Sequence, residues 1–114
     1  MAKDINWRGT SREDFTSMPE GVRRQFDTKL RFLANGVLVS GINSFHGIGP
    51  GGKEFKSGGY RLVLTTEFAD AIHPLHAFKK DSSRGRKTRG RHVEIIKSRY
   101  EELCREYASR SRKQ

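Results

Sequence analysis

The stretch of the sequence best suited to chemistry is a dense run of basic side chains. Between residues 79 and 91 only Asp81 is acidic, whereas seven side chains are basic: Lys79, Lys80, Arg84, Arg86, Lys87, Arg89 and Arg91. Cations at this density attract polyanions, and the planar guanidinium of arginine can donate two hydrogen bonds to one phosphate group. The run therefore predicts contact with phosphates, although an anionic membrane or an acidic partner would also be attracted.

The distribution of charge favours a nucleic acid. Residues 1–78 hold 10 basic and 8 acidic side chains, a net charge of +2, and residues 79–114 hold 13 and 5, a net charge of +8. The length suits a single domain, residues 1–114, with a frayed end over residues 109–114. Cys104 is the sole cysteine, so no intramolecular disulfide is possible. No apolar run reaches about 20 residues, so we expect a cytoplasmic protein without a membrane partner.

Two helices are predicted near the N-terminus, after a short strand over residues 5–7. Residues 10–15 suit a helix capped by Ser11, with the carboxylates of Glu13 and Asp14 near the positive end of its dipole. A second helix is predicted to begin around Pro19, where Ser17 and Glu20 have capping-box spacing, and to end at Asn35-Gly36. Four apolar residues at helical intervals form its predicted core face: Val22, Phe26, Leu30 and Leu33.

The middle of the chain predicts an antiparallel meander. The glycines of residues 45–52 match the dinucleotide fingerprint by accident, since a proline interrupts them and a hairpin follows, so we interpret them as a mobile loop. Residues 53–56 and 60–66 flank a glycine turn, and residues 71–78 form a third strand. Because Pro74 cannot donate a ladder hydrogen bond, this strand lies at an edge or carries a bulge. Strand alternation places His76 in phase with Ile72 and Phe78, and on the face opposite His73.

A helix is predicted at the C-terminal end. We expect residues 84–89 to form a mobile loop that contacts phosphate, and Arg91 to start the helix. Apolar residues with three-four spacing then form a stripe that packs on the sheet or on a partner: Val93, Ile96, Tyr100, Leu103 and Tyr107.

Several short strings occur in a characteristic order over nearly the whole chain. They are WRGTS at 7–11 with DF at 14–15, Pro19 with VR at 22–23, FHGIG at 45–49, KEF at 53–55, YR at 60–61, LHAFKK at 75–80, KT at 87–88 and RHVEIIKSR at 91–99. Together they resemble the RelE/ParE superfamily of type II toxin-antitoxin toxins, and more closely its HigB-like, phage-derived branch. The chain departs from that family at His46, where members usually carry Lys, and at Arg89, where they carry Pro. Pro74 also replaces a typical β-branched residue.

The resemblance implies an α+β, RelE-like fold, in which N-terminal helices and a C-terminal helix pack on a small twisted, mainly antiparallel sheet. It also implies a toxin that acts as an mRNA endoribonuclease, commonly on the translating ribosome, and so inhibits translation. The implied partners are mRNA, the ribosome and a cognate antitoxin, for which we expect a helix-turn-helix protein encoded next to it.

Cleavage of RNA needs little from the protein, because the 2′-hydroxyl is the nucleophile. The protein must remove or orient the proton of that hydroxyl, stabilise the added charge on phosphorus and protonate the leaving 5′-oxygen. No cofactor or metal is expected, because the histidines are scattered and no metal-binding Cys or His spacing occurs. We rank Arg61 and Lys79 first as catalytic cations and Arg91 next. Further RNA contacts are predicted for six residues: Lys53, Lys80, Arg84, Arg86, Lys87 and Arg89.

The general base stays open among four side chains: His46, Glu54, His76 and His92. Of these, His46 and Glu54 are placed in the predicted catalytic set. Three of the four candidates also have a structural interpretation: His76 as a packed, hydrogen-bonded strand residue, His92 as part of an exposed first helical turn, and Glu54 as a cross-strand salt-bridge partner.

Two other functions suit the same sequence. A ParE-like inhibitor of DNA gyrase would share the fold but would not need Arg61 and Lys79 for chemistry. A noncatalytic nucleic-acid-binding module would use the basic run only as a salt-sensitive phosphate clamp. Fold does not choose among the three, because function depends on the site.

Overall fold

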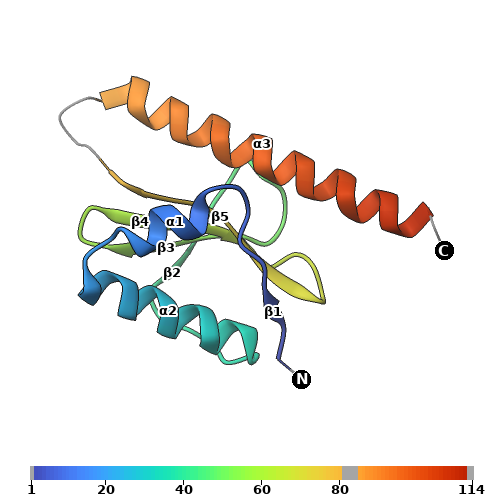
Figure 1. Cartoon of the computed structure of the whole chain (residues 1–114), viewed down its shortest axis with the longest axis horizontal. Helices are drawn as coiled ribbons and strands as arrows, with labels where there is room; N and C mark the ends of the chain where they lie inside the picture. The colour runs from blue at the N-terminus through green and yellow to red at the C-terminus, as the bar shows by residue number, and fades with distance from the viewer. Residues whose placement is uncertain (1, 81–84, 113–114) are drawn as a thin grey trace.

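The computed structural model describes the backbone of residues 2–80 and 85–112, and the side chains of residues 2–80 and 90–110. Within these ranges a five-stranded sheet has the order β1-β5-β4-β3-β2 and helices on both faces (Figure 1). The elements are, in chain order, β1 (Asp4–Ile5), α1 (Ser11–Thr16), α2 (Glu20–Ala34), β2 (Ile42–Ser44), β3 (Gly52–Ser57), β4 (Tyr60–Thr65), β5 (Ala71–Lys79) and α3 (Gly85–Arg112). This architecture confirms the predicted α+β fold.

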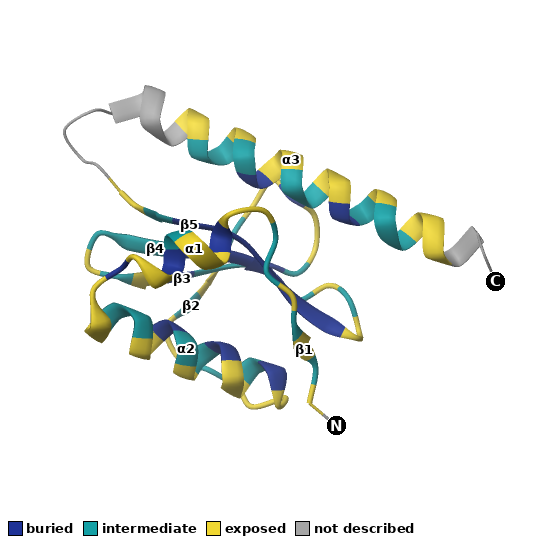
Figure 2. Ribbon diagram, in the orientation of Figure 1, coloured by how far each residue is buried: buried dark blue, intermediate teal, exposed yellow. Residues whose placement is uncertain are grey.

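The sheet separates two hydrophobic cores (Figure 2). On one face, Phe26 and Leu30 of α2 are fully buried with Phe15 of α1. On the other face, Ile96 and Leu103 of α3 are buried against the sheet. Both sides of the central strands are therefore apolar, as expected for a sheet covered by helices on each face.

The N-terminal helices form where predicted, but their caps differ. Ser11 is not the cap of α1: it lies within the first turn, buried, and its hydroxyl donates to the carbonyl of Pro74 at 3.2 Å. The capping box is also wrong, because the Ser17 hydroxyl donates instead to the carbonyl of Asp14 at 2.7 Å. The two hydroxyls thus serve the packing of α1 on β5 and the turn after α1.

Helix α2 has the predicted core face and the predicted end. Phe26 and Leu30 are buried, and Val22 and Leu33 pack against the same core. The helix ends at Ala34, and the backbone of Gly36 has φ of 76°, a conformation that glycine adopts without strain.

The predicted hairpin is confirmed as β3 and β4, joined at Gly58 and Gly59. The strand predicted over residues 5–7 is shorter and earlier, and it pairs in parallel with β5: Asp4 with Ala71 and Ile5 with Ile72. The residues between α2 and these glycines, for which no element was predicted, form the additional strand β2, antiparallel to β3. The glycines that follow make a turn in which Ile48 is buried against the α3 core.

Strand β5 resolves the alternatives left by its proline, because it is a central strand with a bulge. Val63 pairs with His76 and Leu64 with Pro74, which leaves Leu75 as the extra residue. Such a residue shifts the alternation of side chains by one position. The carbonyl of Pro74 accepts a hydrogen bond from the backbone N–H of Arg8 at 3.0 Å, in addition to the one from α1.

The bulge overturns two sequence-based expectations. His73 and His76 both reach α3, where the Nε2 atom of His73 lies 2.8 Å from the Tyr107 hydroxyl and that of His76 lies 2.7 Å from Nδ1 of His92. They therefore do not lie on opposite faces. Likewise, His76 is not in phase with Ile72, which belongs to the core on the other side of the sheet.

Helix α3 begins at Gly85, earlier than the predicted start at Arg91. The backbone of residues 85–89 is helical rather than a loop, as suits the good helix propensity of lysine and arginine. Residues 81–84, and the side chains of residues 85–89, lie outside the described part of the chain. Four of the five residues of the predicted apolar stripe are confirmed: Ile96 and Leu103 are buried, and Tyr100 and Tyr107 pack against the same core, whereas Val93 is only half-buried. The predicted frayed end lies partly outside the described residues.

Two phenylalanines of α2 provide a test of the first core. Phe26→Ala should lower the free energy of unfolding by about 3–5 kcal/mol, because it removes a fully buried ring and leaves a cavity. Phe32→Ala is the matched control, since that ring is 48% exposed, and its effect should stay within about 0.5 kcal/mol. Urea denaturation of the two variants measures the difference, and similar losses in both would contradict this assignment of the core.

Candidate functional site

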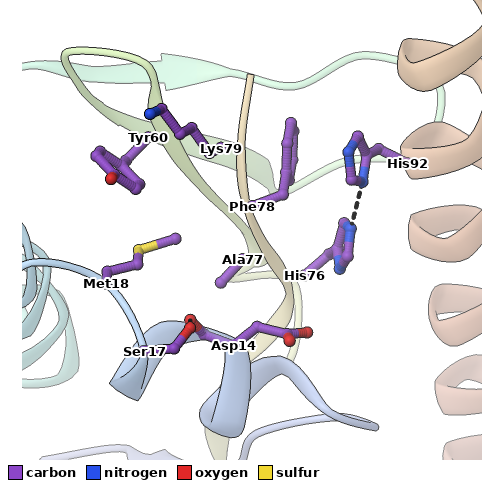
Figure 3. A pocket seen from close by; sticks show the side chains of 9 residues that line it. All are labelled: Asp14, Ser17, Met18, Tyr60, His76, Ala77, Phe78, Lys79 and His92. Atoms are coloured by element: carbon purple, nitrogen blue, oxygen red, sulfur yellow. Dashed lines mark hydrogen bonds between the residues drawn. The ribbon is translucent and has the colours of Figure 1, made fainter. Parts of the chain in front are cut away.

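A pocket of about 300 Å³ lies at the C-terminal part of β5, where the strand meets α1 and α3 (Figure 3). Strand β5 contributes four consecutive lining residues, and β4, α3, α1 and the turn after α1 contribute the others. The lining consists of Asp14, Ser17, Met18, Tyr60, His76, Ala77, Phe78, Lys79 and His92.

Three aromatic rings form one side of this pocket. His76 Nε2 and His92 Nδ1 are hydrogen-bonded at 2.7 Å, as the dashed line in Figure 3 shows. The ring of Phe78 stacks on His92 with centroids 4.1 Å apart and on His76 at 5.1 Å. The stack fixes the plane of each imidazole, so the pair has little freedom to turn.

Burial keeps both imidazoles of the pair uncharged at neutral pH. It lowers the pKa of His76 to about 4, and the adjacent His92 and the Arg99 guanidinium act in the same direction. Burial, followed by the charge of Arg91, also lowers the pKa of His92, whereas Asp14 opposes the shift at both histidines. A neutral imidazole carries one N–H donor and one lone pair, so the tautomer decides what the pair can do.

The other side of the pocket supplies charge. The Nζ atom of Lys79 lies 5.6 Å from the centre of the Tyr60 ring, close enough for a cation–π contact. A carboxylate oxygen of Asp14 accepts a hydrogen bond from the Thr10 hydroxyl at 2.9 Å. An ammonium, a carboxylate and an uncharged imidazole pair thus line one cavity, a set that can bind a phosphate and move a proton.

The structure separates the two cations ranked first. Lys79 pairs across the sheet with Tyr60, whereas Arg61 pairs with Phe78, so the two side chains leave the sheet on opposite faces. The guanidinium of Arg61 donates to the carbonyls of Gly58 and Tyr60, at 2.7 and 2.9 Å. Lys79 lines the pocket and Arg61 does not.

The predicted bases His46 and Glu54 also lie outside the pocket lining. His46 is exposed in the turn between β2 and β3. The Oε1 atom of Glu54 lies 3.7 Å from Nζ of Lys56 on the same strand, so this salt bridge runs along β3 rather than across the sheet.

The remaining predicted contacts lie at different places. Lys53 is on β3 opposite Leu64, and Lys80, which is exposed, directly follows β5. Arg91 is exposed on α3, next to His92 in the sequence. The other predicted RNA contacts lie outside the described side chains: Arg84, Arg86, Lys87 and Arg89.

Sequence reasoning missed Asp14 and the pairing of the two histidines. Asp14 was assigned to the dipole of its helix, and nothing in the local sequence indicates that α1 packs over β5. His76 is hydrogen-bonded and buried, as its structural interpretation predicted, but its partner is His92, which is half-buried rather than exposed. The string LHAFKK, which resembles the family, contains both His76 and Lys79 and was the strongest available signal.

The described residues contain neither a candidate metal site nor a helix suited to a membrane. Among these residues no group of three or more His, Cys, Asp or Glu side chains could hold a metal ion. Within the same part of the chain, no helix has both the length and the apolar character required to cross a bilayer.

Comparison with known proteins agrees with this geometry at the level of family and fold. Residues 13–101 match the sequence family described as phage derived protein Gp49-like (DUF891). No curated protein matches the sequence. The chain is similar to the crystal structure of the isolated E. coli RelE toxin, with 18% identity over 83% of this chain and 99% of that chain and a TM-score of 0.59.

Two further solved structures are similar. A double arginine-to-alanine mutant of E. coli RelE in the free state shares 20% identity over 84% of this chain and 99% of that chain, with a TM-score of 0.59. A toxin-antitoxin complex, RelBE2 from Mycobacterium tuberculosis, shares 14% identity over 70% of this chain and 100% of that chain, with a TM-score of 0.48.

The pKa of His76 gives a prediction about stability and pH. Because the unfolded chain binds this proton near pH 6.5 and the folded chain only near pH 4, the free energy of unfolding should fall as the pH is lowered between these values. In His76→Gln the free energy of unfolding should fall less over this pH range, since glutamine does not titrate. Urea denaturation at a series of pH values measures the slope, with His46→Gln, in an exposed turn outside the pocket, as the control. Equal slopes for the wild type and His76→Gln would contradict the assignment.

Proposed function

Because the chain belongs to the phage-derived Gp49-like family and has the fold of RelE, we propose that it is the toxin of a type II toxin-antitoxin system and cleaves mRNA without a metal ion. The observation that carries the proposal is the pocket at the C-terminal part of β5, where the hydrogen-bonded His76 and His92 share a cavity with Lys79. Such a cavity suits one phosphate group, and the basic residues nearby suit the neighbouring phosphates of an RNA strand.

The proposed reaction uses the substrate's own hydroxyl. The 2′-oxygen forms a bond to the adjacent phosphorus and the bond from phosphorus to the 5′-oxygen breaks, which leaves a 2′,3′-cyclic phosphate and a 5′-hydroxyl. The proton of the 2′-hydroxyl passes to a base in the pocket, and the 5′-oxygen takes a proton from water. Asp14 is the carboxylate among the pocket-lining residues, and we assign it the role of base.

We assign Lys79 the role of stabilising the negative charge that develops on the phosphate in the transition state. Its ammonium lies over Tyr60 and lines the cavity, so it is in place before the substrate arrives. Arg91, exposed beside His92, is assigned to an adjacent phosphate, as is Lys80. Tyr60 offers a face on which a base can stack. Arg61 leaves the sheet on the same face as Phe78 but lies outside the pocket lining, so it is given no part in the reaction.

The proposed partners follow from this activity. Its substrate is mRNA, with cleavage on the translating ribosome in the cytoplasm. A cell that carries such a nuclease requires an inhibitor, so we propose a cognate antitoxin of the helix-turn-helix class, encoded beside the toxin.

Cleavage can be tested in growing bacteria by inducing the protein and mapping transcript 5′ ends. We expect growth arrest with breaks at codon-related positions. Growth arrest with intact transcripts and a DNA-damage response would instead favour a gyrase inhibitor. Absence of both arrest and cleavage would leave a nucleic-acid-binding module.

A matched pair of lysines tests the site. Lys79→Ala should lower the rate of RNA cleavage by about 10²–10³-fold, because it removes a preplaced cation from the pocket. Lys56→Ala removes the same charge from β3, outside the pocket lining, and should retain most of the activity. The measurement is the rate at which each purified variant cleaves a defined RNA. Equal losses of rate in both variants would show that only overall charge is important.

A further inference from the structure

The guanidinium of Arg99 lies behind the histidine pair and joins three parts of the fold. Its Nη1 atom donates to the carbonyl of Leu75 in the β5 bulge at 2.7 Å, and its Nη2 atom donates to the hydroxyl of Thr10 before α1 at 3.0 Å. Nη1 also lies 3.4 Å from Nδ1 of His76. The hydrogen bonds to Leu75 in β5 and to Thr10 in the N-terminal turn hold the guanidinium of Arg99 from two sides.

Gly9 completes this arrangement. A Cβ atom at this position would lie 2.5 Å from Nε of Arg99 and 2.7 Å from Cζ, and the backbone of Gly9 has φ of 54°. The absence of a side chain at Gly9 therefore leaves the room that the guanidinium occupies. The N-terminal turn both makes space for Arg99 and provides a hydroxyl to bind it.

The contact between Arg99 and His76 has a fixed direction. A guanidinium has only N–H donors, so Nδ1 of His76 must accept and carries no proton. Neutral His76 then has its proton on Nε2 and donates to Nδ1 of His92. Neutral His92 in turn carries its own proton on Nε2. The opposite arrangement would place the Nδ1–H of His76 against an N–H of Arg99.

We propose that Arg99 is a positioning residue that fixes this series of donors, so that His92 offers the pocket an N–H rather than a lone pair. The inference rests on the proposed RNA cleavage for its purpose, but the tautomers themselves do not depend on it. An uncharged N–H can donate to a phosphate oxygen that gains charge in the transition state, and no proton needs to be transferred. The pair is thereby excluded from the role of base, which remains with the carboxylate of Asp14.

The charged groups around the pair support this state. Arg99 faces His76 and Arg91 faces His92, both from α3, and these cations disfavour an imidazolium. Lys79 shares the pocket from β5. Asp14 faces the pair from α1 and acts in the opposite sense. With burial and two arginines against one carboxylate, the pair stays neutral, and Arg99 selects which neutral form is present.

Nitrogen-15 NMR of the full chain can test the tautomers directly. In the wild type at neutral pH, both histidines should show a protonated Nε2 and a bare Nδ1. In Arg99→Met, which keeps much of the side-chain bulk without a donor, His76 should become a mixture of tautomers, and its pKa should rise above about 4. Arg105→Met, an exposed arginine on the same helix, is the matched control and should leave both rings unchanged. A wild-type His76 with its proton on Nδ1, or unchanged tautomers in Arg99→Met, would overturn the proposal.

A second variant keeps the test valid if Arg99→Met does not fold. Gly9→Ala retains Arg99 but displaces its guanidinium, so it should also mix the His76 tautomers. A folded Gly9→Ala with wild-type tautomers and a displaced guanidinium would again overturn the assignment.

Activity measurements separate this inference from the proposed function. RNA cleavage by Arg99→Met should fall by about 10²-fold, with a changed pH profile, and Arg99→Lys, which retains a donor, should restore part of the rate. If Arg99→Met cleaves like the wild type despite altered tautomers, the positioning role is wrong while the nuclease stands. If the wild type cleaves no RNA but shows the expected tautomers, the proposed function fails and the fixed series of donors remains.

Discussion

Pro74 has no backbone N–H, and it lies in the middle of β5, a strand with neighbours on both sides. The sheet accommodates it by the bulge at Leu75, and the proline carbonyl is bonded twice, by the backbone of Arg8 and by the hydroxyl of Ser11. The bulge turns both Leu75 and His76 toward α3. One residue that cannot join the ladder thus determines which side chains meet the last helix, and the pocket is built where they meet it.

The far end of α3 is fixed by a second set of polar and aromatic contacts. Tyr107 stacks on Phe68 with centroids 3.9 Å apart and donates to Asp70 at 2.6 Å. This hydrogen bond lowers the pKa of the Asp70 carboxyl, while burial and the same bond raise the pKa of Tyr107 to about 12. Nearer the middle of the helix, Tyr100 donates to Glu67 at 2.5 Å. With its middle and far end held in this way, the helix presents His92 to His76 of β5.

The sequence was informative wherever local chemistry decides the structure. The apolar spacing of α2, the Asn35-Gly36 stop and the glycine turn before Tyr60 all led to the elements that form, because each signal lies within a few residues. Family-like strings led to the RelE fold. The position of the site was less accessible: Arg61 and Lys79 lie on neighbouring strands, but strand alternation sends them to opposite faces. The role of Asp14 and the partner of His76 depend on how helices pack on a bulged strand, and no short-range pattern encodes that.

The hydrogen bond between Thr10 and Arg99 joins residues that are 89 positions apart in the chain. During synthesis the N-terminal turn leaves the ribosome long before Arg99 has been made, and contacts of such separation form late because loop closure must come first. The backbone and side chains that hold the histidine pair can therefore come together only after Arg99 has been made. A growing chain that has not yet reached Arg99 lacks this contact, so the order of synthesis itself delays whatever chemistry the pocket performs.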